Sequence, residues 1–369
     1  MNKFQSALFA FTMSAVAFSS CKKESIEPPP PPPGGYTVPT TYNFANVNYS
    51  GQSYRLDMMT ALTTYMKTGN TPNTVVSAAT MKNMYSNSGS PFSDSVLDNC
   101  GKQIKNKIYP ADQLLFEAFM DSLALASTST VTGSNGVAGV VVSSADPSKK
   151  YLCDANGVEW TQVIEKGIMG ACFYYQTTAF YLDASQIGTG VDNTTVIPGE
   201  GTAMEHHWDE AFGYFGVPVD FPANVATVRY WGKYCNERNT LMGTNATMMN
   251  AFLAGRAAIS NNDHSVKDAQ VTVIRETWDK YLAATIISYL NKAVTNISDD
   301  AQRNHSLSEA IGFLIAIKYN PACLLDSTQI AAVQAYIGTN LYNVTIANLN
   351  LAKDLISSVY NLDNIKNSL

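Results

Sequence analysis

The chain has 369 residues, of which 46% are hydrophobic and 15% are charged, and its net charge is −6. This hydrophobic content argues against a disordered chain, and the acidic balance excludes a basic face for phosphates, so no nucleic-acid partner is expected. About 330 residues remain after an N-terminal leader, enough for one large domain or two small ones with a substantial core.

Residues 1–20 resemble a bacterial lipoprotein signal peptide. A cationic start at Lys3 precedes an apolar stretch from Leu8 to Phe18, which is too short to remain in a membrane as a span. Two serines then precede Cys21, as in a lipobox whose cysteine becomes the lipidated first residue. The alternative is an ordinary secretory signal peptide cleaved nearby. We expect a membrane partner through the lipid anchor at Cys21, and an outer-membrane lipoprotein in the bacterial cell envelope, on its periplasmic or surface-exposed face.

Residues 21–41 predict a tether between the lipid and the domain. Six consecutive prolines, Pro28 to Pro33, are followed by two glycines, and polyproline is a stiff, extended spacer of about 3 Å per residue. The domain is expected over residues 42–369. Five cysteines follow Cys21 without a CxxC pair, so disulfides are permitted in an oxidising envelope and at least one thiol is left free.

Apolar residues at three- and four-residue steps predict a mainly α fold. The first helices are expected at residues 56–66, 72–87, 94–107 and 110–126. β-branched residues at 137–142 and a turn within 151–158 predict a small inserted β-hairpin. An aromatic-rich helix at 159–184, a loop at 186–199 and a helix ending near Gly216 follow. The last helices are expected at 240–261, 266–296, 300–319, 327–341 and 346–360, with Asp263 and Asp300 as caps. The pattern indicates a helical bundle, or two packed bundles.

The segment Glu205–Glu210 contains two of the four histidines, His206 and His207. Glu210 follows them by four and three residues, so both imidazoles can meet its carboxylate on one helix face. Imidazole and carboxylate are common ligands of divalent transition metals and also form a general acid–base pair. On a helical wheel, His207 and Glu210 border a core stripe made by Met204, Trp208, Ala211 and Phe215. The alternative is a surface helix with solvated charges.

A second pair, His305 and Glu309, has the same four-residue spacing and continues on one face with small residues. The alternative is a helix crossing with an exposed polar end. Because both places set a histidine and a glutamate one turn apart, we expect His305 and Glu309 to face the same pocket as His207 and Glu210. Arg256, flanked by small residues in an apolar helix, is typical of a guanidinium that pairs a buried carboxylate, for a structural or a functional purpose.

The sequence contains no HExxH pair, GxSxG elbow or P-loop. The lipobox, the helical domain and the His/Glu helix resemble the imelysin-like family of bacterial envelope proteins, and within it Bacteroidetes lipoproteins of unassigned function. His207 and Glu210 would occupy the His and Glu places of that family's GxHxxE motif, whose glycine is Glu205 here. The resemblance runs from Tyr42 to the C-terminus and implies two packed helical bundles, with links to iron uptake and to peptidase activity.

These features predict a membrane-anchored lipoprotein that binds a metal ion or metal-containing ligand, with iron or zinc as the divalent metal. His207 and Glu210 are the expected metal ligands, and His206, His305, Glu309 and Arg256 are further ligand-binding candidates. One alternative is a metallopeptidase-like hydrolase that uses the same residues. Another is a non-catalytic module that binds glycan or protein through the aromatic helix at 173–181. Binding is favoured over catalysis.

Overall fold

The computed structural model describes residues 35–369, so the predictions for the signal peptide, Cys21 and most of the tether lie outside the described residues. Helices dominate this part of the chain. Its one sheet is an antiparallel pair, β1 (Gly139–Val142) and β2 (Lys150–Cys153), with Gly139 opposite Cys153. The prediction of a mainly α fold with a small β-hairpin is confirmed.

Four helices precede the hairpin: α1 (Ser50–Lys67), α2 (Ala78–Ser86), α3 (Ser95–Asn99) and α4 (Gln113–Ser127). The helix expected at 72–87 begins only at Ala78, because Ser77 caps it by accepting a hydrogen bond from the backbone N–H of Thr80. The helix expected at 94–107 is reduced to α3 and a 3-10 turn at Lys105–Lys107. Between them Gly101 adopts a φ of 68° that ends the helix.

After the hairpin, α5 (Trp160–Ile168) continues through two π-helical segments, Met169–Tyr174 and Gln176–Tyr181, before the short helix α6 (Ala184–Ile187). The sequence predicted one helix here and gave no sign of the wider π-helical winding. π-helical segments are rare and often occur at functional sites.

The remaining helices are α7 (Ala203–Phe215), α8 (Tyr230–Met242), α9 (Thr244–Ser260), α10 (His264–Thr295), α11 (Asp300–Ile317), α12 (Ser327–Ile337) and α13 (Ile346–Tyr360). The helix expected at 240–261 corresponds to α9, and α8 was not predicted. Asp263 caps α10 as expected. Asp299, rather than Asp300, caps α11, since its carboxylate accepts the backbone N–H of Gln302 at 3.0 Å.

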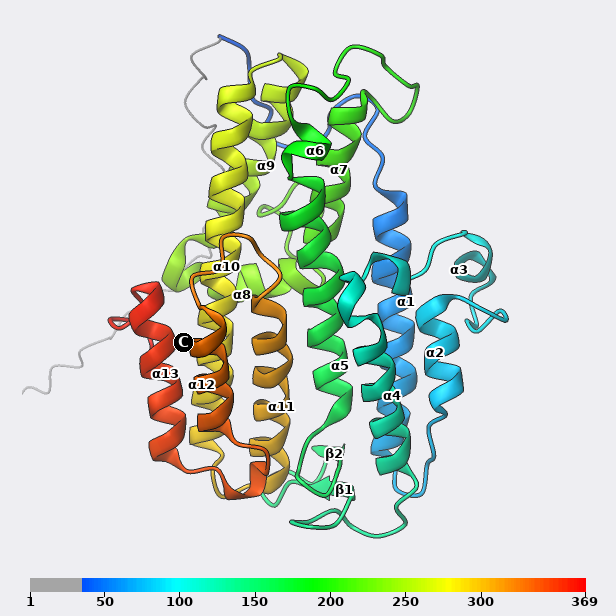
Figure 1. Cartoon of the computed structure of the whole chain (residues 1–369), viewed down its shortest axis with the longest axis vertical. Coiled ribbons are helices and arrows are strands. Elements are labelled where there is room, and N and C mark those ends of the chain that lie inside the picture. Colours follow the sequence, from blue (N-terminus) through cyan, green and yellow to red (C-terminus); the bar gives the residue numbers. More distant parts are fainter. Residues whose placement is uncertain (1–34) are drawn as a thin grey trace, which may run out of the picture.

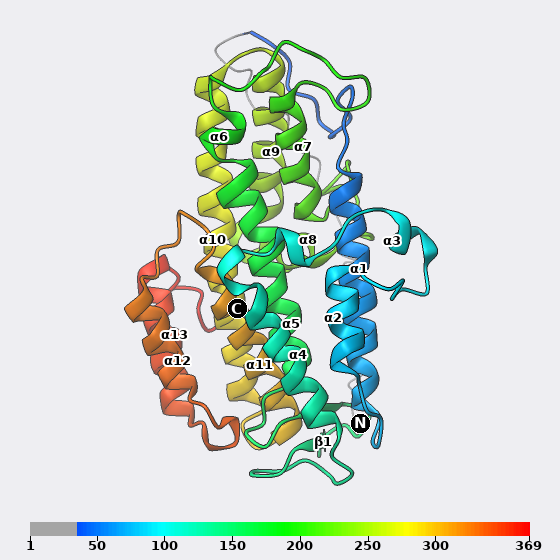
Figure 2. The same cartoon turned by 45° about the vertical axis from the view of Figure 1, so that its right-hand side comes forward.

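Figures 1 and 2 show that α10 runs through most of the length of the molecule. Helices α6, α7 and α9 surround its upper part, whereas α1, α2, α4, α5 and α11 form the lower part, with the hairpin at the lower end (Figure 1). Helices α12 and α13 pack against each other in the lower half of the molecule, where α13 packs on α10 and α12 on α11. Two groups of helices are therefore present, but they share α10 and the run from α5 to α6.

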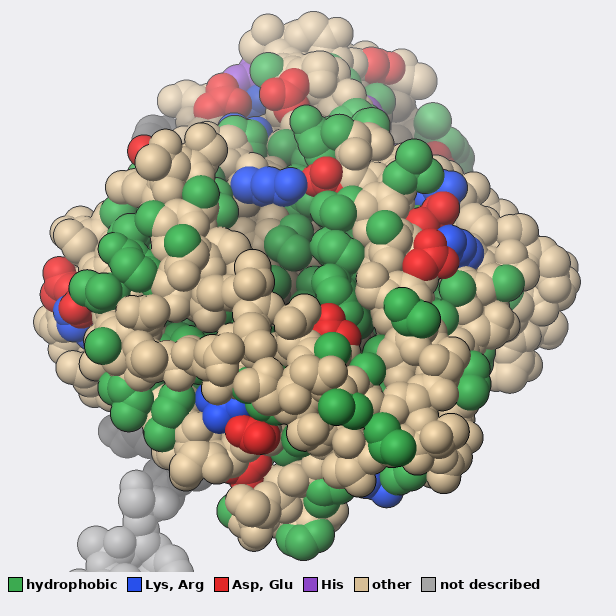
Figure 3. All heavy atoms as spheres, turned by 60° about the horizontal axis from the view of Figure 1, so that its bottom comes forward, with side chains coloured by type: hydrophobic (Ala, Val, Ile, Leu, Met, Phe, Trp, Pro, Cys, Tyr) green, Lys and Arg blue, Asp and Glu red, His purple; other side chains and the backbone are tan. Residues whose placement is uncertain are grey.

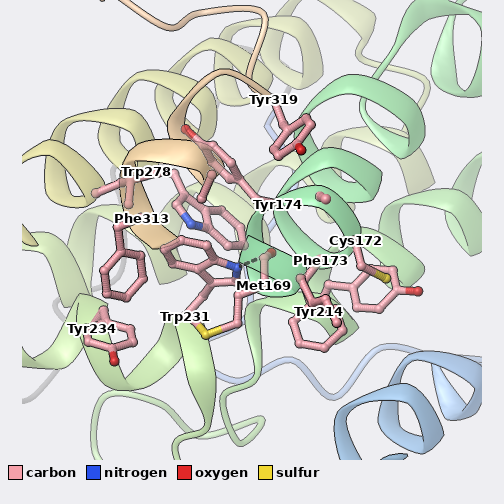
Figure 4. Close-up of a cluster of buried hydrophobic side chains, with 14 of the residues drawn as sticks. Met169, Cys172, Phe173, Tyr174, Tyr214, Trp231, Tyr234, Trp278, Phe313 and Tyr319 are labelled. Carbon is pink, nitrogen blue, oxygen red and sulfur yellow. Dashed lines mark hydrogen bonds between the residues drawn. The ribbon is translucent and has the colours of Figure 1, made fainter. Parts of the chain in front are cut away.

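One hydrophobic core runs through both groups. Figure 4 shows its aromatic centre, where Trp231, Trp278 and Tyr174 meet with ring centroids 5.5–5.9 Å apart. The indole N–H of Trp231 donates to the carbonyl of Met169 at 2.9 Å. The core thus joins the two groups and does not divide at their boundary.

The packed domain reaches back into the segment for which a tether was predicted. Val38 is buried, and the Tyr36 hydroxyl donates to Asp263 at 3.2 Å. Within residues 35–369, no helix is both long and apolar enough to cross a membrane, and the five cysteines are all unpaired. On the face at the hairpin end, Figure 3 shows charged side chains in small groups, most of them of both signs.

Candidate functional site

A polar cavity of about 160 Å³ lies where the first turns of α1 meet α7, and it is called the α1–α7 pocket below. The residues that matter for its chemistry are Gln52, Arg55, Lys102, Lys107, Glu200, His206 and Glu210. They come from three segments that are far apart in the sequence. The pocket is therefore a product of tertiary packing.

Two glycines set the position of α7. A Cβ at Gly213 would lie 2.6 Å from the Cβ of Tyr49 and 3.0 Å from that of Gln52, so this glycine lets α1 approach α7 closely. A Cβ at Gly255 would lie 2.0 Å from the Trp208 ring, so α9 likewise approaches the other side of α7. The predicted core stripe of Met204, Trp208, Ala211 and Phe215 is buried, as expected. With that stripe against the core, Glu210 is directed toward α1.

The carboxylate of Glu210 is held at one oxygen and open at the other. Its Oε1 accepts hydrogen bonds from Gln52 Nε2 at 2.8 Å and from the Tyr181 hydroxyl at 3.0 Å. Its Oε2 lies 3.9 Å from Nε2 of His206. The Nδ1 atom of His206 is buried and has no hydrogen-bond partner among the described residues. One carboxylate oxygen and one imidazole nitrogen therefore face each other at the pocket.

The groups around Tyr181 keep its hydroxyl protonated, so that it donates a hydrogen bond to Glu210. Burial, and then the charge of Glu210, raise the pKa of the Tyr181 hydroxyl, so it stays protonated toward the carboxylate. Lys107 donates to the same hydroxyl oxygen at 3.0 Å. Burial lowers the pKa of Lys107, although Glu210 opposes the shift. This chain of contacts orients Glu210 and brings a cation near it.

Two further cations line the pocket. Arg55 is only 4% exposed, and its guanidinium donates to the backbone carbonyls of Gln103 at 2.8 Å and Gly51 at 3.0 Å. No ion pair joins Arg55 or Lys102 to a carboxylate in residues 35–369. Counted with His206 neutral, three cations face the two carboxylates of Glu200 and Glu210.

His207, the expected partner of Glu210, points elsewhere. Its Nδ1 lies 2.7 Å from the backbone carbonyl of Gln186 at α6, and its ring is beside that of Tyr181. It does not line the α1–α7 pocket. No hydrogen bond or ion pair of the described chain joins it to Glu210, so the structure brings Glu210 together with His206 instead. The physical reason is that α1 packs on the edge of α7 that carries His206, while α6 packs on the edge that carries His207.

Arg256 is buried beside the pocket and joins α9 to α7. Its Nε donates to Asp209 Oδ1 at 2.9 Å, and its Nη1 donates to Glu205 Oε1 at 2.5 Å. Tyr42 donates to the same Asp209 oxygen at 2.8 Å. Burial raises the pKa of Asp209 to about 7, against the opposing effect of Arg256. Arg256 thus pairs buried carboxylates as expected, and its place makes it a support of α7, outside the pocket lining.

His305 and Glu309 belong to a separate cluster at the hairpin end. His305 Nδ1 lies 2.6 Å from the buried Glu159, its Nε2 lies 3.5 Å from Glu309, and its ring stacks on Tyr151 of β2. Lys166 lies 3.8 Å from Glu309. None of these residues lines the α1–α7 pocket, and Figure 1 shows α7 in the upper part and the hairpin at the lower end. The expectation that the two His/Glu pairs share a pocket is wrong.

The described residues contain no group of three or more His, Cys, Asp or Glu side chains placed to hold a metal ion. His206 and Glu210 supply two donors that converge. The other residues of the pocket were missed by sequence reasoning. Tyr181 falls in the aromatic run that was noted, and Arg55 is a polar residue on a buried helix, but no local pattern connects either of them to Glu210.

Comparison with known proteins places the chain in one family. Residues 39–339 match the family described as Domain of unknown function (DUF4856). That range includes the α1–α7 pocket and the His305 cluster. No curated protein and no solved structure matches the chain.

Proposed function

The chain belongs to the family described as Domain of unknown function (DUF4856), and because that description names no activity, we propose from the site that the protein binds a metal-containing ligand in the α1–α7 pocket. The observation that carries the proposal is the meeting of His206 and Glu210 with Arg55, Lys102 and Lys107 around one cavity. The pocket thus combines two side chains that can donate to a metal with three cations. The donor pair and the cations each restrict the kind of ligand that fits.

The donor pair suits a transition-metal ion. Glu210 Oε2 and His206 Nε2 are 3.9 Å apart, and a side-chain rotation that shortens this distance to about 3.3 Å would let one tetrahedral ion bind both atoms at about 2 Å. Imidazole nitrogen and carboxylate oxygen are the donors that zinc and iron accept. Gln52 and Tyr181 hold the other oxygen of Glu210, as partners of a ligating carboxylate commonly do.

The rest of the pocket disfavours a bare ion. Two protein donors leave a four-coordinate metal about half coordinated, and three nearby cations repel a free metal ion. An anionic chelator meets both conditions, because its carboxylates complete the coordination and pair with Arg55, Lys102 and Lys107. We therefore assign the ligand as a metal ion carried by a small carboxylate chelator, with ferric citrate as the working example.

The size of the pocket favours binding over hydrolysis. A cavity of about 160 Å³ accommodates a small chelate, whereas sites for larger ligands are typically about 300–1,000 Å³. The metallopeptidase alternative needs room for an extended peptide as well as the metal. The proposal includes the lipid anchor at Cys21 and the proline-rich tether, which would hold the binding domain at the membrane of the cell envelope, and a role in iron uptake.

The test is a binding measurement on the protein purified without a histidine tag. Calorimetric titration with ferric citrate, citrate alone and zinc chloride compares the whole chelate with its parts. We expect saturable 1:1 binding of ferric citrate and much weaker binding of either part, because the chelate uses both halves of the pocket. Equal binding of citrate with and without iron, or no binding of any of them, would contradict the proposal.

A further inference from the structure

A second cavity, of about 420 Å³, lies where the 3-10 turn Pro110–Asp112, the π-helical segment Gln176–Tyr181 and the end of α11 meet. It is called the tyrosine pocket below, because Tyr109, Tyr175 and Tyr319 form its aromatic wall. It shares no lining residue with the α1–α7 pocket. Figure 4 shows Tyr319 at the edge of the buried aromatic cluster, away from Trp231.

The three rings form a continuous aromatic surface. Ring centroids of Tyr109 and Tyr175 are 5.2 Å apart, those of Tyr109 and Tyr319 are 5.7 Å apart, and those of Tyr175 and Tyr319 are 6.5 Å apart. Tyr319 is 5% exposed and Tyr109 is 39% exposed, so the surface extends from the core to solvent. Tyr109 is exposed and Tyr175 is half-buried, and neither hydroxyl makes a hydrogen bond within residues 35–369, so both can bond a ligand.

An acid–base pair borders the rings. Asp112 Oδ2 accepts the Tyr319 hydroxyl at 2.6 Å and lies 2.8 Å from the ammonium of Lys318. That ammonium also lies 4.9 Å from the Tyr319 ring centroid. The other carboxylate oxygen of Asp112 makes no contact with the described residues at hydrogen-bond distance. Asp112 and Lys318 together therefore carry no net charge. One oxygen of Asp112 is free to accept a hydrogen bond, and the ammonium of Lys318 can still donate one.

The backbone beside the tyrosine pocket has an unusual, π-helical winding. Tyr175 lies between the two π-helical segments and Ala179 lies in the second, and both line the cavity. The backbone N–H of Tyr109 donates to the carbonyl of Ala171 in the first π-helical segment at 2.8 Å, which fixes the turn that carries Tyr109 and Asp112. A π-helix is uncommon and frequently marks a functional site. The π-helical winding is therefore an indication of a ligand site that does not depend on the aromatic residues.

We infer that the tyrosine pocket binds a neutral carbohydrate. The apolar C–H face of a sugar ring packs on the tyrosine rings. Its hydroxyl groups donate to the free oxygen of Asp112 and accept from Lys318, and they satisfy the open hydroxyls of Tyr109 and Tyr175. The cavity volume is in the range of small-molecule sites.

The charges exclude the other ligands that an aromatic wall attracts. Tyrosine rings beside a carboxylate often bind a quaternary ammonium group. Here the Lys318 ammonium already occupies both the Asp112 carboxylate and the face of the Tyr319 ring, so a second cation would be repelled. An anion would meet Asp112. A ligand that is uncharged and rich in hydroxyl groups avoids both penalties.

The test titrates the purified protein with neutral oligosaccharides (cellotetraose, mannotetraose, laminaritetraose and chitotetraose) and, for comparison, with choline and a sulfated oligosaccharide. At least one neutral oligosaccharide is expected to bind saturably. Tyr109→Ala and Tyr175→Ala should each weaken that binding at least tenfold, with helical circular dichroism unchanged. Phe180→Ala is the matched control, because Phe180 is exposed on the same π-helical segment but does not line the pocket.

The inference is overturned if no neutral oligosaccharide of the panel binds, or if only choline or only the sulfated sugar binds. It is also overturned if Tyr109→Ala and Tyr175→Ala bind as tightly as the unmodified protein, since binding would then lie elsewhere. A loss with Phe180→Ala equal to that with Tyr109→Ala would indicate a general effect on the segment and would equally count against the pocket.

Discussion

Nε2 of His206 and Oε2 of Glu210 face each other at 3.9 Å across one turn of α7. The pair lies at the pocket that also contains Arg55, Lys102 and Lys107, and the neighbouring His207 bonds the carbonyl of Gln186 on another side. Two adjacent histidines thus have different surroundings. This difference allows the proposed metal-binding role to be tested one residue at a time.

His206→Gln should abolish most of the affinity for ferric citrate, because it removes one of two converging metal donors. The loss is expected to exceed the ~10–100-fold that removal of an outer-shell partner costs. His207→Gln is the matched control and should leave the affinity within about twofold. Calorimetric titration of both variants is the measurement. If the His207 variant loses affinity and the His206 variant retains it, the pairing with Glu210 has been assigned to the wrong histidine.

Lys102→Gln should weaken ferric citrate binding about fivefold, which corresponds to ~1 kcal/mol, because a carboxylate of the chelator loses a cation. The affinity of the unmodified protein should also fall as salt rises, since exposed charges are screened. Lys105→Gln is the control from the same segment, because Lys105 pairs with Glu117 at 2.6 Å and lies outside the pocket. An unchanged or tighter affinity for Lys102→Gln would show that the ligand is not anionic at this side.

Arg256→Ala should destabilise the fold by ~3–5 kcal/mol, because it leaves the buried Asp209 and the partly buried Glu205 without their cation. Urea denaturation followed by circular dichroism gives the free energy of unfolding. Arg229→Ala should cost only about 1 kcal/mol, since its pair with Asp57 is partly exposed to solvent. Equal losses in the two variants would mean that Arg256 does not hold α7 to α9.

The His305 cluster should make stability depend on pH. Burial opposes the charged imidazole, but the charge and hydrogen bond of Glu159 outweigh it, so the pKa of His305 is raised above its usual 6.5. The folded state therefore binds the proton more tightly, and this contribution is fully present below pH 6.5 and is lost as pH rises through the folded pKa. The difference in unfolding free energy between the protein and His305→Gln should accordingly shrink from pH 5.5 to pH 8.5. A difference that grows over this range would show that Glu159 does not hold a charged imidazole.

Local patterns predicted the helices whose caps and apolar steps are visible in the sequence. The helix expected at 346–360 coincides with α13, where Thr345 caps the start and Asn361 adopts a left-handed conformation after the end. Helix α8 was missed because its buried face, which begins with Trp231, Tyr234 and Cys235, continues with the charged Arg238 in place of an apolar residue. The π-helical winding of 169–181 could not be predicted, since it changes backbone hydrogen bonding without a characteristic residue pattern.

Only the part of the candidate site that lies on α7 could be predicted from the sequence. The wheel of α7 placed Met204 and Trp208 in the core and put Glu210 at its edge, which is confirmed. The wheel could not show which edge of α7 packs against α1, because that depends on the close approach of the two helices at Gly213. Arg55 and Lys107 come from segments about 100 or more residues away and reach Glu210 only through tertiary packing. For the same reason the sequence wrongly joined His305 to this pocket.

The most direct test of the account is to locate the metal. Crystals of the protein grown with ferric citrate, measured at the iron absorption edge, show iron positions by anomalous scattering. The account predicts one strong peak about 2.2 Å from both His206 Nε2 and Glu210 Oε2, with citrate carboxylates next to Arg55 and Lys102. Iron bound at the His305 cluster, or an α1–α7 pocket without iron at saturating ferric citrate, would contradict it.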